Sequence, residues 1–259
     1  MPITSITPNQ QARISELAAA ASRNVVYEAL DAMLLPSEVA QKKIIEKGGD
    51  FQSLIAPQFR VIVSRALNQL AGLIHPQAEQ LEKYFSEVHS YKLDLTGVKF
   101  PEQSGFTTWM AVPKNLDEDR IMRDIVTKFG CKSYKWMKGI AQNIDYDAEQ
   151  TRPAGIYVIS HRGGDDPDVE HHGKSYDDAA ESKMLFMSAK EYLLATSFHR
   201  WSTGHFMDKK NGWTRTSSLW SDGSLVEGCW TEQDHGLVLG SGDRDDRDPS
   251  CGPRELFLD

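Results

Sequence analysis

The sequence predicts an α+β protein, with a helical region over residues 1–90 followed by a mixed domain of helices and short strands over residues 91–259. Apolar residues recur at helical spacing up to about residue 90. From Tyr91 on, alternating or β-branched runs stand between helical segments. Beyond Trp213 the chain is rich in Asp, Ser, Gly and Arg, and turn residues separate short apolar runs. Helices followed by such a mixed region are typical of the α+β class.

Four helices are expected in the first region. One starts near residue 9 and ends at Pro36, because proline does not continue a helix. Four helices joined by short loops would form a bundle, or an arm that docks on a partner or joins copies of the chain into a homo-oligomer. The other three are expected at 38–47, which stops at a Gly-Gly pair, at 57–73, and at 77–88 after a proline.

The second region is expected to hold two longer helices and several short strands. The helix at 116–129 has one apolar face and a glycine after its end. The helix at 188–201 starts with a capping box, Ser188 and Glu191, and is closed by Gly204. Strands are expected at 91–95, 106–112, 156–159, 225–226, 236–239 and 255–258, and a polar loop at 163–182.

The composition excludes some classes of partner. A net charge of -8 and an isoelectric point of about 5.5 argue against nucleic-acid binding, which depends on clustered Lys and Arg. No run of about 18 apolar residues is present, so no membrane span is expected. The first residues lack a basic stretch followed by a long apolar run, so no secretory signal is expected and the cytoplasm is the default address.

The three cysteines are Cys131, Cys229 and Cys251. They are too few and too scattered for a disulfide framework, so reduced thiols are expected. A bridge between Cys229 and Cys251 stays open at this point.

One polar cluster runs from His161 to His172 and has the residue types of a divalent-metal site. Its spacing matches no helix-borne pair such as H-E-x-x-H. We therefore favour a solvated acidic loop, with a metal site as the alternative, and expect no bound metal or other cofactor. The residues of that alternative are His161, Asp165, Asp166, His171 and His172.

Other segments match known sites only in part. Gly163-Gly164 is followed by two aspartates, which would repel phosphate. His199 and His205 flank a helix end, but no Ser or Cys stands in a nucleophile setting, so both are read as structural and no catalytic residue is expected. The run 243–248 lacks the Gly and Glu of an EF-hand and is expected to make local ion pairs, with a calcium site as the alternative.

Three tryptophans stand out near the end of the chain. Trp213 and Trp230 are expected to pack in the core, as most tryptophans do. Trp220 is followed by Ser-Asp-Gly, so it is expected at a turn and facing outward. An exposed tryptophan among small polar residues is typical of a binding face.

The end of the chain contains, in order, Trp213-Thr-Arg-Thr-Ser-Ser, Trp220-Ser-Asp-Gly, Leu-Val-Glu-Gly-Cys-Trp230, Gly-Leu-Val-Leu239 and Asp-Arg-Asp-Pro-Ser-Cys-Gly-Pro-Arg254. These segments resemble the C-terminal variable segment of hypervariable bacterial proteins that are targets of diversity-generating retroelements, a family with a C-type-lectin-like fold. The resemblance spans about 105–256 and includes Tyr157-Val-Ile-Ser-His-Arg. The family pattern often ends in aliphatic-Gly-Ala-Arg, where this chain has Cys251-Gly-Pro-Arg254.

The resemblance implies a diversified segment at about 213–254. In that family a reverse transcriptase mutates adenines, chiefly in AAC codons, so variable positions carry residues whose codons end in C. Residues 214–259 contain no Lys or Met, which fits this bias. Three tryptophans, Glu227 and Glu232 would be fixed scaffold. The implied ligand-binding residues are Trp220, Gly228, Cys229, Asp234, His235, Val238, Gly240, Ser241, Asp243, Asp245 and Asp246.

The function expected from this resemblance is ligand binding without catalysis, through a diversified C-terminal surface that takes a protein or another macromolecule. Two alternatives stay open. One is a metal-dependent enzyme built on the 161–172 loop. The other is a structural or assembly protein of a phage or mobile element, in which the N-terminal helices do the work.

Overall fold

The computed structural model describes residues 75–96, 98–209 and 212–258. The first three expected helices lie outside these described residues, and so does most of the region 1–90 on which the assembly alternative depends. Contacts within the chain divide it into two units, Met1–Pro76 and Gln77–Asp259. The expected helix at 77–88, which the sequence analysis grouped with the N-terminal region, is therefore part of the second unit.

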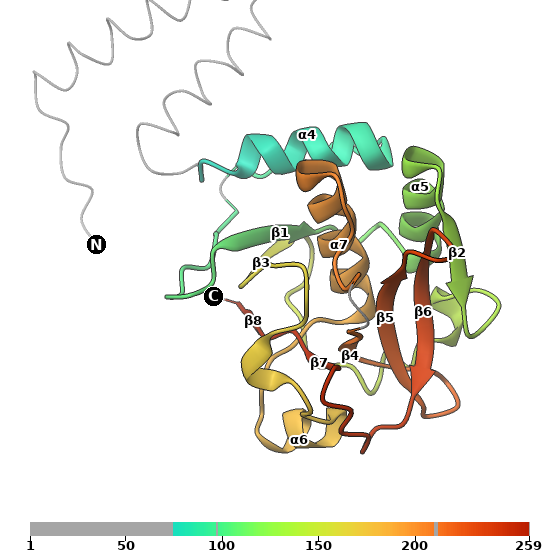
Figure 1. Cartoon of the computed structure of the whole chain (residues 1–259). Helices are drawn as coiled ribbons and strands as arrows, with labels where there is room; N and C mark the ends of the chain where they lie inside the picture. Colours follow the sequence, from blue (N-terminus) through green and yellow to red (C-terminus); the bar gives the residue numbers. More distant parts are fainter. Residues whose placement is uncertain (1–74, 97, 210–211, 259) are drawn as a thin grey trace, which may run out of the picture. The chain divides into compact units, whose positions relative to one another are not determined.

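The second unit is mixed α+β, as the sequence predicts (Figure 1). None of the helices among the described residues is long and apolar enough to cross a bilayer. In chain order the elements are α4 (Ala78–His89), β1 (Thr108–Val112), α5 (Glu118–Phe129), β2 (Lys132–Lys135), η1 (Ala141–Asn143), β3 (Tyr157–His161), η2 (Val169–His171), α6 (Tyr176–Glu181), α7 (Ala189–Thr203), β4 (Thr214–Leu219), β5 (Leu225–Thr231), β6 (Gly236–Gly242), β7 (Gly252–Pro253) and β8 (Leu256–Phe257).

The described strands form two sheets. The smaller sheet has the order β1-β3-β8 and is antiparallel throughout. The larger sheet has the order β2-β6-β5-β4-β7. In it β2 runs parallel to β6 and β7 parallel to β4, whereas the pairs among β4, β5 and β6 are antiparallel. The last residues of the chain therefore join both sheets, because β7 belongs to one and β8 to the other.

Helix α7 is the centre of this unit. It packs against β1 of the smaller sheet and against β4 and β5 of the larger one (Figure 1). The expected capping box is confirmed, since Ser188 Oγ accepts from Glu191 N and the Glu191 carboxylate accepts from Ser188 N at 2.7 Å. Gly204 closes the helix with a left-handed φ of 90°. Nine residues in its first ten positions are buried, so α7 lacks the polar face of a surface helix.

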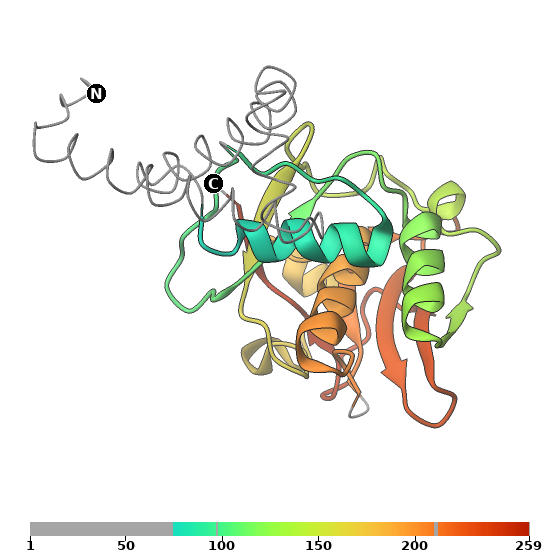
Figure 2. The same cartoon turned by 90° about the horizontal axis from the view of Figure 1, so that it is seen from above.

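Helices α4 and α5 lie beside α7 (Figure 2). The Tyr84 hydroxyl donates to the backbone carbonyl of Leu194 on α7 at 3.2 Å, which fixes α4 to the centre of the unit. Asp117 caps the start of α5 by accepting from Arg120 N, and Gly130 ends it with a φ of 63°. The sequence predicted this glycine cap.

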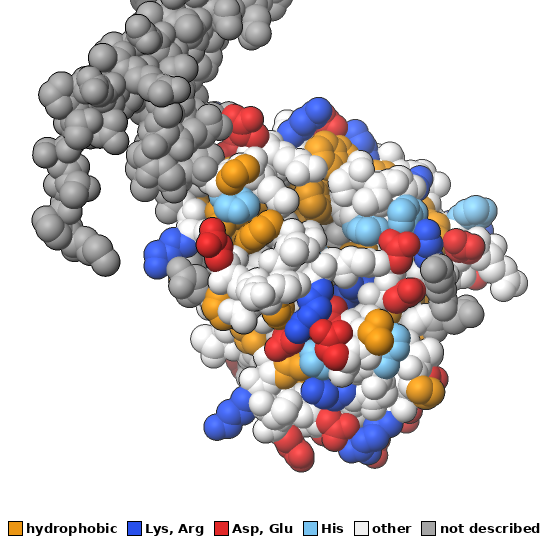
Figure 3. Space-filling view, turned by 60° about the vertical axis from the view of Figure 1, so that its left-hand side comes forward, with side chains coloured by type: hydrophobic (Ala, Val, Ile, Leu, Met, Phe, Trp, Pro, Cys, Tyr) orange, Lys and Arg blue, Asp and Glu red, His pale blue; other side chains and the backbone are white. Residues whose placement is uncertain are grey.

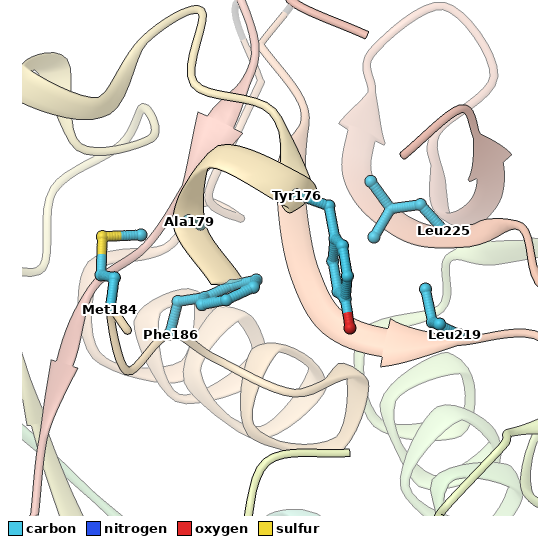
Figure 4. Close-up of a cluster of buried hydrophobic side chains, with 6 residues drawn as sticks. All are labelled: Tyr176, Ala179, Met184, Phe186, Leu219 and Leu225. Atoms are coloured by element: carbon cyan, nitrogen blue, oxygen red, sulfur yellow. The ribbon is translucent and has the colours of Figure 1, made fainter. Parts of the chain in front are cut away.

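Two segments differ from the expected elements. Residues 91–95 alternate in burial, yet they form no strand, because Leu95 N donates to the Glu82 carboxylate on α4 instead of to a neighbouring strand. Residues 163–182, expected as loop, contain η2 and the short helix α6. Ser175 and Asp178 form a capping box at the start of α6. This helix contributes to a buried cluster with β4 and β5 (Figure 4), made of Tyr176, Ala179, Met184, Phe186, Leu219 and Leu225.

Candidate ligand-binding face

The outward face of β2 and β6 is the candidate binding surface. Leu237 and Leu239 of β6 are completely buried, whereas Val238 between them is half exposed. Tyr134 on β2 is paired with Val238 in a parallel register. Because side chains alternate along a strand, Tyr134 and Val238 lie on the same face of the sheet, opposite to the two leucines.

Exposed aromatic rings lie on this face. Trp136, directly after β2, is 61% exposed and Tyr134 is 39% exposed. A Cβ on Gly236 would lie 2.4 Å from the Tyr134 ring, and one on Gly240 would lie 2.9 Å from the Trp213 ring. The two glycines therefore let aromatic rings pack directly on the β6 backbone, and Gly240 is not free to vary. Tyr134 and Trp136 are not among the binding residues expected from the sequence, although the run 132–136 alternates with aromatic residues on one side.

Trp220 faces inward, and the prediction that it faces outward is wrong. The expected turn is present, since Gly223 N donates to the Trp220 carbonyl at 2.8 Å. The side chain, however, is completely buried, and its Nε1 donates to the Gly240 carbonyl at 2.9 Å. The turn directs the backbone to the surface while the indole packs in the core.

Gly228 and Cys229 are also buried, so they are wrong as accessible binding positions. A Cβ on Gly228 would lie 2.0 Å from a ring carbon of Tyr192 on α7, which leaves no room for a side chain. Cys229 is 6% exposed, and burial raises the pKa of its thiol to about 12. Cys131, Cys229 and Cys251 are all free thiols.

Asp246 has a structural partner. The guanidinium of Arg215 is completely buried, with its Nη2 2.6 Å from Asp246 Oδ2 and its Nε 3.3 Å from Glu227 Oε1. Burial raises the pKa of Glu227, although Arg215 acts in the opposite direction. Two carboxylates thus neutralise one buried cation, and a change at Asp246 would leave Arg215 with one of them.

The acidic loop after β6 is fastened to α6. Arg244 Nη2 lies 2.8 Å from Asp177 Oδ1, and Arg247 Nη2 lies 2.8 Å from Asp178 Oδ1. Ion pairs were expected here within the run 243–248, and the structure places their acidic partners on α6.

The remaining candidate positions are at least partly accessible. They make no side-chain hydrogen bond or ion pair to another residue that the structure describes. Asp234 and His235 form the turn between β5 and β6, Val238 lies in the middle of β6, and the rest lie at its far end or just beyond. Accessible positions thus follow β6 along its whole length. They are Asp234, His235, Val238, Ser241, Asp243 and Asp245.

The histidines of the 161–172 loop do not converge on one metal position. His171 Nε2 pairs with Glu255 Oε2 at 3.1 Å, and His172 Nε2 lies 3.1 Å from the Pro167 carbonyl oxygen. His161 is buried, and its Nδ1 accepts from Gly163 N at 3.1 Å. The metal site predicted as an alternative for this loop is therefore wrong in its ligand set.

Arg162 organises the acidic part of the same loop. It lies 3.0 Å from Asp168, 2.6 Å from Glu170 and 2.8 Å from Glu255, measured between the charged atoms. On this side of the molecule acidic, basic and histidine side chains are interspersed (Figure 3). The loop is held by an ion network instead of being freely solvated.

Asp165 contacts two histidines that the sequence analysis read as structural. Its Oδ1 lies 3.0 Å from His199 Nε2 and 2.7 Å from His205 Nε2. Among the described residues, this is the group whose ligand atoms lie close enough together to hold a metal ion. The local sequence gives no signal for it, because the aspartate and the first histidine are 34 positions apart.

A separate polar recess of about 260 Å³ lies beside the N-termini of α5 and α7. Glu118 and Glu149 both line it. Burial raises the pKa of Glu118, and it raises the pKa of Glu149 to about 7. Tyr146 donates to Glu118 at 2.8 Å, and Ser218 donates to Glu149. The Glu149 carboxyl can therefore exchange a proton near neutral pH.

Comparison of the chain with protein-family models, with curated proteins and with solved structures gave no match.

Proposed function

We propose that this chain is a ligand-binding protein of the diversity-generating retroelement type, with a C-type-lectin-like domain that binds a protein through the outward face of β2 and β6. One observation carries the proposal. Trp136 and Tyr134 are exposed large aromatic residues, and Tyr134 is paired with the accessible Val238 of the predicted variable segment. Tryptophan and tyrosine contribute most of the binding energy at many protein interfaces.

The packing of β6 supports a surface that tolerates change. Leu237 and Leu239 are the β6 side chains that pack in the core. Helix α7 packs against the neighbouring strands β4 and β5 of the same sheet. A new side chain at Val238 would change the outward face without removing an apolar group from the interior. The turn at Asp234 and His235 has the same freedom, because loops tolerate substitution better than the elements they connect.

The proposal needs a smaller set of variable positions than the sequence suggests. Gly228, Cys229 and Gly240 are fixed by the packing around them, and Asp246 is tied to a buried arginine. Binding without catalysis is the activity we propose.

The DNA beside the gene tests the retroelement origin. We expect a near-copy of the codons for residues 213–254, adjacent to a reverse-transcriptase gene and differing from them at adenines. The differences should fall on codons for the accessible positions, such as Asp234, Val238 and Asp245, and not on those for Trp220 or Gly228. A neighbourhood without such a copy, or differences spread evenly over buried codons, would contradict this origin.

A cross-linking experiment tests the face itself. A photoreactive amino acid would replace Val238 in one variant and Lys92, an exposed residue after α4, in a matched control. In extract of the source cells, the label at position 238 should give a discrete protein adduct that disappears when Trp136→Ala is added. Equal labelling from both positions, or an adduct insensitive to Trp136→Ala, would show that this face is not the binding surface.

A further inference from the structure

We propose that Asp165, His199 and His205 form a binding site for a zinc ion. Their candidate ligand atoms all lie within 4.8 Å of one another. The two imidazole rings are edge to face, with centroids 5.0 Å apart and an interplanar angle of 85°. All three side chains are partly buried. An ion can therefore reach the site from solvent, while neighbouring residues restrict the positions of its ligands.

Two of the three distances between ligand atoms are close to those of a tetrahedral zinc site. Bonds of about 2.0–2.1 Å to nitrogen and oxygen place neighbouring ligand atoms roughly 3.3 Å apart. Asp165 Oδ1 lies 3.0 Å from His199 Nε2 and 2.7 Å from His205 Nε2. A shift outward by a few tenths of an ångström would therefore admit the ion, without rebuilding either backbone segment.

Buried contacts hold the loop that carries Asp165. Arg254 Nη1 donates to the Gly163 carbonyl at 3.0 Å, and Asp208 N donates to the Asp165 carbonyl. Arg254 and Asp208 are themselves paired at 2.5 Å and almost completely buried. The carboxylate ligand is thus supported by groups that do not depend on a metal.

The chain reversal after α7 brings the two histidines together. His199 lies in the last turns of α7, and Gly204 ends the helix in a left-handed conformation that turns His205 back toward it. Thr203 Oγ1 lies 3.4 Å from His205 Nδ1, the nitrogen that would not bind the ion. An outer partner at this nitrogen orients the ring for coordination through Nε2.

The ligand types select the metal. Two imidazoles and one carboxylate suit zinc and related transition ions, whereas calcium and magnesium prefer oxygen ligands. Three protein ligands leave a fourth position for water, as in zinc sites that are not purely structural.

Lys209 competes with the metal for the same carboxylate. Its Nζ lies 3.6 Å from Asp165 Oδ2. A bound dication would be repelled by this ammonium group, so removing the lysine charge should strengthen zinc binding. This effect separates coordination by Asp165 from a merely structural role of the cluster.

Titration calorimetry of the full chain with zinc chloride tests the site. We expect one zinc ion per chain. His199→Ala and Asp165→Ala should each weaken binding by more than the roughly 10- to 100-fold that loss of an outer partner costs. Lys209→Met should bind more tightly than the unmodified chain, and His172→Asn, at an exposed position outside the cluster, should bind equally well. Circular dichroism would confirm that each variant is folded.

X-ray absorption of the zinc-loaded, unmodified chain gives a second readout that needs no variant. It should report two imidazole ligands, oxygen ligands and no sulfur. The proposal is overturned if zinc binds with the same affinity after His199→Ala, if it fails to bind the unmodified chain, or if the absorption data show a thiolate ligand. None of these outcomes bears on the proposed face of β2 and β6.

Discussion

Arg254 and Asp208 form an ion pair with atoms 2.5 Å apart, and both side chains are almost completely removed from water. Arg254 also donates from Nε to Thr214 Oγ1 at 3.0 Å, and Thr214 donates to Asp208 at 2.6 Å. The pair thus joins the chain end to β4 and to the segment after α7. A buried charge whose partner is removed is strongly unfavourable, since neither water nor another charge replaces it.

Asp208→Asn should therefore lower the free energy of unfolding by about 3–5 kcal/mol. Urea denaturation of the full chain measures this value. Arg247→Ala is the matched control, because its pair with Asp178 is exposed. Loss of an exposed pair should cost far less, because water solvates both charges and screens their attraction. If both substitutions lower the free energy of unfolding equally, then burial does not determine how much the Arg254–Asp208 pair stabilises the domain.

Gly228→Ala should destabilise the domain because the added methyl group would enter the ring of Tyr192. The position of the ideal Cβ is 2.0 Å from a ring carbon, well inside van der Waals contact. Overpacking of a close-packed core costs about 1–3 kcal/mol or more. Denaturant unfolding of Gly228→Ala, Tyr192→Ala and the double variant checks the mechanism. The double variant should be more stable than the sum of the single effects implies, whereas additivity would mean that the two residues do not compete for space.

Glu149 should make the domain less stable as pH rises from about 5 to 7.5. Its pKa is raised from 4.5 to about 7, chiefly by burial, so the native state binds its proton more tightly than the unfolded state does. Between these two pKa values the native state holds more protons, so raising the pH favours unfolding. Once the pH is above both pKa values, the contribution of Glu149 to the free energy of unfolding is lower by about 3 kcal/mol than it is in acid.

Glu149→Gln tests this dependence. The amide keeps an oxygen that can accept from Ser218 and carries no charge to bury. Thermal unfolding between pH 5 and 7.5 should show a change in stability that is more unfavourable for the unmodified chain than for the variant. The difference between the two proteins isolates Glu149 from buried His161, whose lowered pKa acts in the opposite direction. Parallel pH profiles for the two proteins would mean that Glu149 ionises freely in the native state.

Local signals in the sequence were enough for the three longer helices of the described domain, α4, α5 and α7, whereas the short helix α6 was missed. The capping box of Ser188 and Glu191 and the glycines at 130 and 204 mark ends that depend on neighbouring residues alone. Strand β4 was missed, because all six of its residues are buried although five of them are polar. Its side chains are satisfied by distant partners, such as the Val226 carbonyl that accepts from Thr216. The sequence of β4 therefore lacks the alternation of polar and apolar residues that would predict a strand.

Contacts between distant segments explain what was missed at the candidate sites. The turn at Trp220 was visible in Ser-Asp-Gly, but the direction of the indole depends on its burial and on its hydrogen bond to the Gly240 carbonyl on another strand of the sheet. In the alternative metal site, Asp165 was grouped with histidines that are close to it in the sequence. The histidines that are close to it in space are His199 and His205. The exposure of Trp136 depends on β2 being an edge strand, which the sequence alone does not show.

Asp246 and Asp245 are adjacent acidic residues that should respond differently to substitution. Asp246→Ala leaves the buried guanidinium of Arg215 with Glu227 as its remaining carboxylate, so it should lower the free energy of unfolding by about 1.5–3 kcal/mol, the contribution of a hydrogen bond to a charged group. Asp245→Ala should change it by less than about 0.5 kcal/mol, as is usual for exposed positions. Urea denaturation of the two variants gives the comparison. If Asp246→Ala changes the free energy of unfolding as little as Asp245→Ala does, then the contact with Arg215 does not constrain Asp246. The whole loop after β6 would then be free to vary.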